Sequence, residues 1–397
     1  MPKSRGRKSR RTTNQRRGRR TATPSGWGDM EPWARAMVMA DEAEARGDAL
    51  GTLEIMEAFA AGPDGELFWR PWRAKHLMQI AMLGPILPGW VTSRWICNQA
   101  LQSLHEGSRD RGRRAFDLAV ELRGGPANLP GRDVADAHGR VVDRDWVYRQ
   151  LFLYELGGLE FFSRRQASSL LLAAADSVDE WAHTPMGGYR LVGSTSDTVT
   201  WLDLASDQER SVPNVGSACL VVPGEHAIGR LVPIEGGHMF ETQPLVLSAE
   251  VAHRVARDPS DWFHILRDAP ASHEELASRQ ARFPTLITDV PTVVWELAIL
   301  HDVDPPEEVD DWAPLVTRKV LDVAAREVAS PTCRRQEGEV DSWSCLSAAL
   351  LEPTVVTTLR DVARPSDRQT LEQLSLLLAE PAASLCRDAV RVLFDAA

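Results

Sequence analysis

The sequence lacks an apolar run long enough to cross a lipid bilayer. The one real candidate, Leu77 to Val91, is apolar apart from Gln79 but is interrupted by two glycines and two prolines. A membrane-spanning helix needs about 20 consecutive apolar residues. We therefore expect a buried helix that ends before Pro85, followed by a turn through Gly89. The basic N-terminus is not followed by the apolar segment and small-residue cleavage site of a secretory signal. A cytoplasmic protein without membrane contact is predicted.

Cysteine is scarce, and its spacing is irregular. The five cysteines include no C-x-x-C pair, and they are Cys97, Cys219, Cys333, Cys345 and Cys386. An odd and scattered set disfavours both a disulfide framework and a zinc ribbon. We interpret these residues as reduced, mostly buried thiols.

The sequence also lacks the short motifs that are typical of common catalytic mechanisms. The sequence has no G-x-x-x-x-G-K-[ST] loop for phosphates, no H-E-x-x-H, no G-x-S-x-G and no S-x-x-K. These absences leave an enzyme of another type open, but they favour a protein that is not an enzyme. No cofactor and no metal site are predicted.

Carboxylates are missing from the first 28 residues, where ten basic side chains gather. These are Lys3, Arg5, Arg7, Lys8, Arg10, Arg11, Arg16, Arg17, Arg19 and Arg20. The other 35 basic residues of the chain face 56 acidic ones, so the remainder carries a net charge of −21. One polypeptide thus joins a polycation to a polyanion.

Residues 1–28 are predicted to form a disordered basic tail. They contain almost no apolar side chains before Trp27, so burial cannot offset the backbone entropy of about 1–2 kcal/mol per residue that ordering costs. Such a tail would neutralise phosphates and release counterions, which gives salt-sensitive binding to nucleic acid without sequence preference. No aromatics interleave with the charges, so base stacking is not expected. The alternatives are a solvated tail and a tail folded back onto the acidic body, and initiation at Met30 would remove it.

Residues 29–184 have the apolar spacing of helices. The first two helices, with a break at Gly47, resemble the helix-turn-helix of a tetratricopeptide unit, on the residues Ala40, Ala43, Gly47, Asp48 and Leu53. A similar break at Asp110, Arg111 and Gly112 predicts a second hairpin, hence an array of helical hairpins. Another helix is expected from Leu170 to about Trp181, where this domain ends.

Between residues 185 and 247 the apolar period changes from three or four to two. The predicted strands are Tyr189 to Val192, Thr198 to Leu202, Arg210 to Val212, Cys219 to Val222, Ala227 to Ile234, and His238 to Phe240. Five or six short strands in about sixty residues suit a small barrel of the OB or SH3 kind. We therefore predict a small β-barrel inserted into a mainly helical, multidomain α+β protein.

Residues 248–397 return to helical spacing and are predicted to form a C-terminal helical region that packs on the barrel as a bundle. Ser272 with Glu275, and Ser366 with Gln369, fit the capping box at helix starts. Prolines divide this region into helices of ordinary length, and the last helix is expected from about Ala382.

The predicted barrel is a poor candidate for nucleic-acid binding, although OB-like surfaces often bind oligonucleotides through exposed aromatics. Residues 185–247 contain seven acidic and only three basic residues, a net charge of −4 that repels phosphate. Trp201 and Phe240 are therefore predicted to fill the core rather than to stack on bases.

Two further groups of polar residues allow both a chemical and a structural interpretation. The acidic cluster from His301 to Asp311 offers carboxylates for Mg²⁺ or Ca²⁺ but lacks the spacing of an EF-hand, which favours a solvated connection. Asp143 and Asp145, near His138, would serve acid–base chemistry in a pocket, yet acids at a helix start are also favoured by the helix dipole. His183, His226 and His238 lie around the barrel and are interpreted as surface or satisfied groups.

The sequence therefore favours a non-catalytic interaction protein. Its helical and barrel parts would bind another macromolecule, and its tail would hold it to nucleic acid or a ribonucleoprotein. The first alternative is an enzyme with its pocket between the N-terminal helices and the barrel, with Asp143, Asp145 or a nearby histidine as acid or base. The second is a purely structural protein-interaction module. The sequence does not indicate an oligomeric state.

Overall fold

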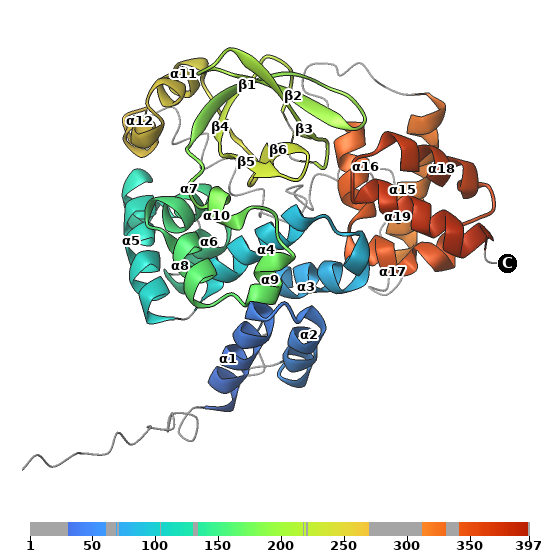
Figure 1. Cartoon of the computed structure of the whole chain (residues 1–397), viewed down its shortest axis with the longest axis horizontal. Coiled ribbons are helices and arrows are strands. Elements are labelled where there is room, and N and C mark those ends of the chain that lie inside the picture. Colours follow the sequence, from blue (N-terminus) through green and yellow to red (C-terminus); the bar gives the residue numbers. More distant parts are fainter. Residues whose placement is uncertain are drawn as a thin grey trace, which may run out of the picture.

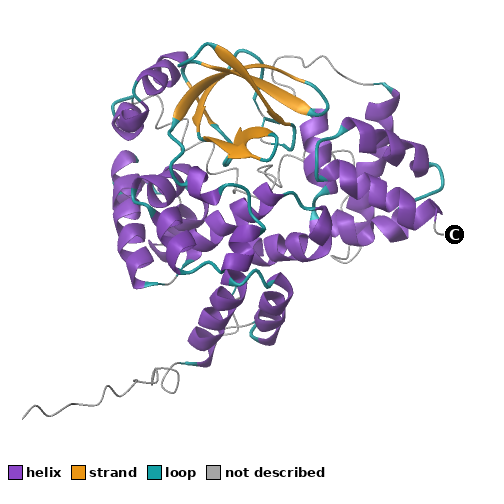
Figure 2. Cartoon of the chain, viewed as in Figure 1, coloured by secondary structure: helices purple, strands orange, loops and turns teal. Residues whose placement is uncertain are grey.

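The computed structural model describes residues 31–60, 69, 71–103, 105–129, 134–216, 218–219, 221–269, 312–330 and 341–395. Several predictions fall outside these ranges: the basic tail, the acidic cluster from His301 to Asp311, and the capping box of Ser272 and Glu275. Within the described residues, helices dominate, and a five-stranded antiparallel sheet and a two-stranded hairpin are present, which confirms a helix-rich α+β protein (Figure 2). No described helix is both long and apolar enough to cross a membrane.

The first part of the chain is entirely helical. Its longer helices are α1 (Pro32–Ala45), α2 (Ala49–Ala58), α3 (Pro71–Leu83), α4 (Gly89–Gln102), α5 (Glu106–Leu122) and α6 (Val134–Arg144). Shorter ones follow: α7 (Trp146–Gln150), the π-helical turn η3 (Leu151–Glu155), α8 (Gly158–Arg165), α9 (Ser169–Ala173) and α10 (Val178–Trp181). The 3-10 turn η1 (Gly84–Ile86) joins α3 to α4, and a second 3-10 turn, η2 (Pro126–Asn128), follows α5. As predicted, α3 ends before Pro85. The turn was expected to run through Gly89, but α4 already begins at that residue, with Pro88 as its N-cap.

The helical hairpin predicted at the start of this part is present. Gly47 has a φ of +83°, the left-handed conformation that ends a helix without strain in glycine. The Asp48 side chain then caps α2 by accepting a hydrogen bond from the Gly51 N–H at 2.9 Å. Figure 1 shows this hairpin projecting away from the sheet.

The prediction of a second hairpin, with a break at Asp110, Arg111 and Gly112, is wrong. α5 runs without interruption through these residues to Leu122. A Cβ atom on Gly112 would lie 3.3 Å from the Tyr148 hydroxyl, so the glycine allows α5 to approach α7 closely instead of ending the helix. The single helix expected from Leu170 to Trp181 is also wrong, because the left-handed φ of 42° at Ser177 separates α9 from α10.

Seven strands follow in the part of the chain that the structure describes, and they do not close into a barrel. They are β1 (Gly187–Ser194), β2 (Thr198–Asp203), β3 (Gln208–Pro213), β4 (His226–Gly229), β5 (Leu231–Ile234), β6 (Gly237–Phe240) and β7 (Leu245–Leu247). Five form an antiparallel sheet in the order β3-β2-β1-β4-β7, while β5 and β6 pair only with each other among the described residues. The chain leaves the sheet at Arg230, directly after β4, so the OB- or SH3-like barrel is corrected to an open sheet with a separate hairpin.

The individual strand predictions were accurate where the side chains alternate. β1, β2 and β3 cover the predicted runs, but the run from Ala227 to Ile234 is divided between β4 and β5. The described residues of the run from Cys219 to Val222 are not in a strand, and β7 was not predicted. Trp201 and Phe240 are fully buried, with their ring centroids 5.1 Å apart, which confirms their prediction as core residues.

The remaining helices among the described residues fall into two groups on either side of the sheet (Figure 1). The first group, α11 (Ala249–Arg257), η4 (Pro259–Asp261) and α12 (Trp262–Arg267), follows β7 and packs on β1 and β4. The second is a bundle with its own apolar core and consists of α15 (Trp312–Ala329), α16 (Ser342–Leu350), α17 (Pro353–Val362), α18 (Asp367–Leu377), α19 (Ala382–Val390) and the π-helical turn η6 (Arg391–Asp395).

Two local predictions for this bundle can be compared with the structure. The last long helix begins at Ala382, as expected. The prediction of a capping box at Ser366 and Gln369 is wrong, because the Ser366 side chain makes no capping hydrogen bond. The carboxylate of Asp367, the first residue of α18, instead accepts a hydrogen bond from the N–H of Arg364, which precedes the helix, at 2.6 Å.

Candidate functional site

The structure accounts for Asp145 and His138 without acid–base chemistry. Asp145 caps α7 by accepting a hydrogen bond from the Tyr148 N–H at 2.9 Å, and it pairs with Arg123, whose Nε lies 2.7 Å away. The ring of His138 packs on Phe116 with the centroids 4.6 Å apart. The ten basic residues of the tail lie outside the described ranges, so their predicted contact with nucleic acid stays a prediction.

Four of the five cysteines are described, and they are buried as predicted, whereas Cys333 lies outside the described residues. Cys97, Cys219, Cys345 and Cys386 are all buried and free of disulfides. Within the described part of the chain, no three histidine, cysteine or acidic side chains come together as a metal site would require.

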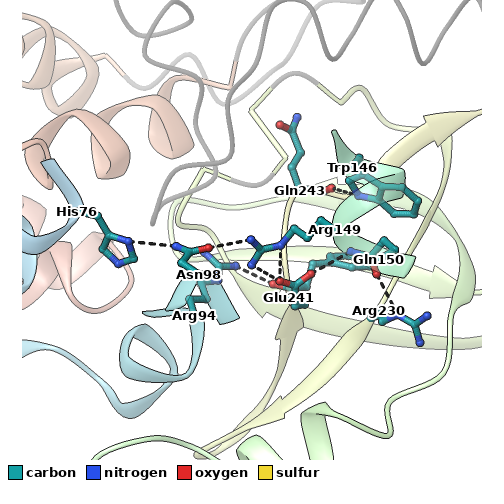
Figure 3. A network of polar contacts seen from close by, with 10 residues as sticks. His76, Arg94, Asn98, Trp146, Arg149, Gln150, Arg230, Glu241 and Gln243 are labelled. Atoms are coloured by element: carbon teal, nitrogen blue, oxygen red, sulfur yellow. Dashed lines mark hydrogen bonds and ion pairs between the residues drawn. The ribbon is translucent and has the colours of Figure 1, made fainter. Parts of the chain in front are cut away.

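The most extensive polar arrangement that the structure describes is a buried network between the N-terminal helices and the sheet (Figure 3). Its centre is Glu241, which follows β6 and is only 1% exposed. Arg149 of α7 donates to one carboxylate oxygen through Nε at 2.8 Å and also through Nη2. Gln150 donates to the other oxygen at 3.0 Å. Both oxygens of the carboxylate therefore have partners from consecutive residues of one helix.

Arg230, which directly follows β4, extends the network from Gln150 to Glu155. Its Nε donates to the Gln150 side-chain oxygen at 2.9 Å, while Nη2 pairs with Glu155 of η3. Trp262 of α12 donates to the same Glu155 oxygen at 2.8 Å. The guanidinium carbon of Arg230 also lies 4.3 Å from the centroid of the Tyr154 ring, a favourable cation–π distance. One chain of contacts thus joins α7, η3, α12 and the sheet.

His76 of α3 lies at the other end of the network. Arg149 Nη1 donates to the Asn98 side-chain oxygen at 2.8 Å, and the Asn98 amide nitrogen lies 3.1 Å from His76 Nδ1. Arg94, one turn before Asn98 on α4, donates to the Phe240 carbonyl at 2.7 Å. Burial, together with the charges of Arg149 and Arg94, lowers the pKa of His76 to about 3. The imidazole is therefore neutral at physiological pH.

The Cys97 thiol and the Tyr154 hydroxyl, which both experience the charge of Glu241, are poor nucleophiles. Burial, and then the charge of Glu241, raises the pKa of the Cys97 thiol far above its usual range, although Arg149 opposes this. The same two causes raise the pKa of the Tyr154 hydroxyl. A nucleophilic cysteine needs a lowered pKa, so this environment favours a structural role for both side chains.

The sequence contains no local signal for this network. Arg149 and Glu241 are 92 positions apart, and neither belongs to a recognisable motif. The one available hint is that Arg149 and Gln150 interrupt an otherwise apolar run from Val147 to Tyr154. Charged residues inside such a run are rarely buried without partners.

Comparisons with known proteins identify no relative of this chain. No family model, no curated protein and no solved structure matches the chain. The fold and the site therefore define the class only as a helix-rich α+β protein with a buried polar junction.

Proposed function

We propose that this chain is a non-catalytic binding protein that engages nucleic acid or a ribonucleoprotein through its basic tail, residues 1–28, without sequence preference. The observation that carries the proposal is the separation of charge along the chain. Ten basic residues precede the first carboxylate at Asp29, and the rest of the chain has a net charge of −21. A polycation of this density binds phosphates by releasing their counterions.

The described part of the chain supports a scaffold rather than a catalyst. The carboxylate of Glu241 is shared by Arg149 and Gln150, and the thiol of Cys97 is held protonated. These groups are engaged with one another and are closed off from solvent. The sheet segment carries a net charge of −4, so the tail is the better surface for phosphate.

The proposal is tested by measuring the binding of full-length protein to fluorescent duplex DNA and single-stranded RNA across a salt series. Six to ten phosphate contacts predict a loss of about 10³ to 10⁵ in affinity between roughly 50 and 200 mM salt. A variant without residues 1–28, and a matched variant of full length with the ten basic residues replaced by glutamine, should both lose this binding. Binding that either variant retains, or that does not respond to salt, would overturn the proposal.

An enzyme is the second candidate, because the polar network lies at the junction where a pocket between the helices and the sheet was expected. The residues there differ from those expected: His76, Arg149 and Glu241 take the place of Asp143 and Asp145. This candidate requires a small molecule to reach His76, and a direct test of that contact follows in the next subsection. A protein that binds neither nucleic acid nor a small molecule would be a purely structural interaction module.

A further inference from the structure

The protonation state of His76 follows from its neighbours. An arginine side chain has only donors, so the Asn98 atom that faces Arg149 Nη1 at 2.8 Å must be the amide oxygen. The Asn98 nitrogen is then the atom that faces His76 Nδ1, and it donates to that nitrogen at 3.1 Å. A neutral imidazole that accepts at Nδ1 carries its proton on Nε2. Arg149 therefore sets the tautomer of His76 through Asn98.

Among the residues that the structure describes, the Nε2–H of His76 has no hydrogen-bond partner. The side chain is 6% exposed, and this nitrogen is buried without an acceptor. A buried donor without a partner costs stability, and in native proteins such groups are usually satisfied by water or by a ligand. Gln99, next to Asn98 on α4, is another buried side chain of this kind, because both polar atoms of its amide lack partners among the described residues.

The electrostatic environment selects the kind of acceptor. Arg149 and Arg94 are the two charged groups that act on His76, and both disfavour its protonation. The same positive potential favours an acceptor that carries negative charge. The imidazole itself stays neutral, so it would bind such a group as a hydrogen-bond donor of fixed direction.

We propose that His76 Nε2–H anchors a small binding site for an oxyanion, a carboxylate or a phosphate, at the junction of α3 and α4. Asn98 is a positioning residue in this site, since it holds the imidazole in the donating tautomer. The site goes beyond the proposed function of the tail and does not depend on it. His76, Asn98 and Arg149 all lie outside residues 1–28, so different variants test the two proposals, which succeed or fail separately.

The test is a nuclear magnetic resonance titration of the full-length protein with labelled histidine. Long-range nitrogen–proton spectra should first show His76 protonated on Nε2. Addition of acetate in one series, and of inorganic phosphate in another, should then shift the His76 Nε2 and Hε2 signals to saturation. The series that saturates at the lower concentration identifies the source of the oxygen. His183 is exposed and serves as the internal reference.

His76→Phe removes the donor and keeps an aromatic ring in place. Loss of one hydrogen bond to a charged group predicts affinity for the anion about ten- to hundredfold weaker, whereas His183→Phe should bind as the original protein does. If His76→Phe does not fold, the titration of the unaltered protein still decides. A His76 proton found on Nδ1, or shifts that never saturate or that match those of His183, would overturn the proposal.

Discussion

Glu241 illustrates how individual residues hold the junction between the helices and the sheet. Its carboxylate is nearly inaccessible to water and accepts hydrogen bonds from Arg149 and Gln150. Burying a charge is costly unless a partner and further hydrogen bonds compensate for it. Each partner here therefore depends on the presence of the others, and removing one leaves an uncompensated charge in the interior.

Glu241→Gln should destabilise the protein strongly. The substitution preserves the shape of the side chain but leaves Arg149 buried without its counter-charge, so we expect the free energy of unfolding to fall by about 3–5 kcal/mol. Urea denaturation followed by tryptophan fluorescence measures this change. The matched control is Glu160→Gln, which breaks an exposed pair with Arg164 on α8 and should cost no more than about 0.5 kcal/mol. Equal effects of the two substitutions would contradict a buried, coupled network.

His76 should make stability depend on pH in a defined direction. Burial first, and then Arg149 and Arg94, lower its pKa from 6.5 to about 3 in the folded protein. Between these values the unfolded chain binds a proton that the folded chain does not. Stability is therefore complete above pH 6.5 and falls by about 1.4 kcal/mol for each pH unit below it, until pH approaches 3.

His76→Gln removes this titration. The difference in unfolding free energy between the original protein and this variant should therefore change by about 2 kcal/mol from pH 6.5 to pH 5, and the original protein should lose more stability. Urea denaturation at several pH values gives this difference, and contributions common to both proteins cancel. Parallel pH curves would mean that His76 is protonated in the folded protein.

At the scale of elements, β1 and α11 are in unusually close contact. A Cβ atom on Gly188 of β1 would lie 2.1 Å from the Ala252 carbonyl oxygen of α11, which no real structure accommodates without movement. Gly188→Ala should therefore displace α11 and lower the free energy of unfolding by about 1–3 kcal/mol or more. Gly193→Ala, on the same strand, places its methyl group in open space and should change stability by no more than about 0.5 kcal/mol. Thermal unfolding compares the two, and similar losses would show that packing against α11 does not limit β1.

Secondary structure was predictable where local pattern decides it. β2 shows this, since Val199 and Trp201 alternate with more exposed neighbours and both point into the core. Closure of the sheet was not predictable, because it depends on which strand pairs with β5 after the chain turns at Arg230. Gly112 was misinterpreted for a related reason. Whether a glycine ends a helix or admits a neighbouring helix depends on residues far away in the sequence.

The candidate site was even less accessible to sequence analysis. Asn98 and Arg149 are 51 positions apart, and Arg149 and Glu241 are 92 apart. Motif searches depend on fixed local spacing, and this network has none. Only the placement of polar residues inside apolar runs pointed to buried partners, and it did not identify them.

At the scale of the whole molecule, polar bridges attach the C-terminal bundle to the rest of the chain. Lys75 of α3 pairs with Glu352, and the Gln79 amide donates to the Leu351 carbonyl at 2.6 Å. At the sheet, Asn214 donates to the Thr195 carbonyl at 2.7 Å and to the Asp341 carboxylate at 3.2 Å. Leu83 of α3 and Cys219 are buried in the apolar core of the bundle, so these polar bridges act together with apolar contacts in coupling its unfolding to the rest of the chain.

Asn214→Ala should loosen this attachment. The substitution removes these two hydrogen bonds and the one that the Asn214 oxygen accepts from Ser344. Asp341 and Ser344, at the start of α16, then each have one buried partner fewer, which costs about 1–3 kcal/mol. Hydrogen exchange measured by mass spectrometry should then accelerate in α16 and in the turn between β1 and β2, while α4 and α7 stay protected. Thr357→Ala is the control, because its hydroxyl bonds only within α17. Uniform acceleration of exchange over the whole chain would contradict this prediction, because it would mean that the sheet and the bundle unfold as one cooperative unit.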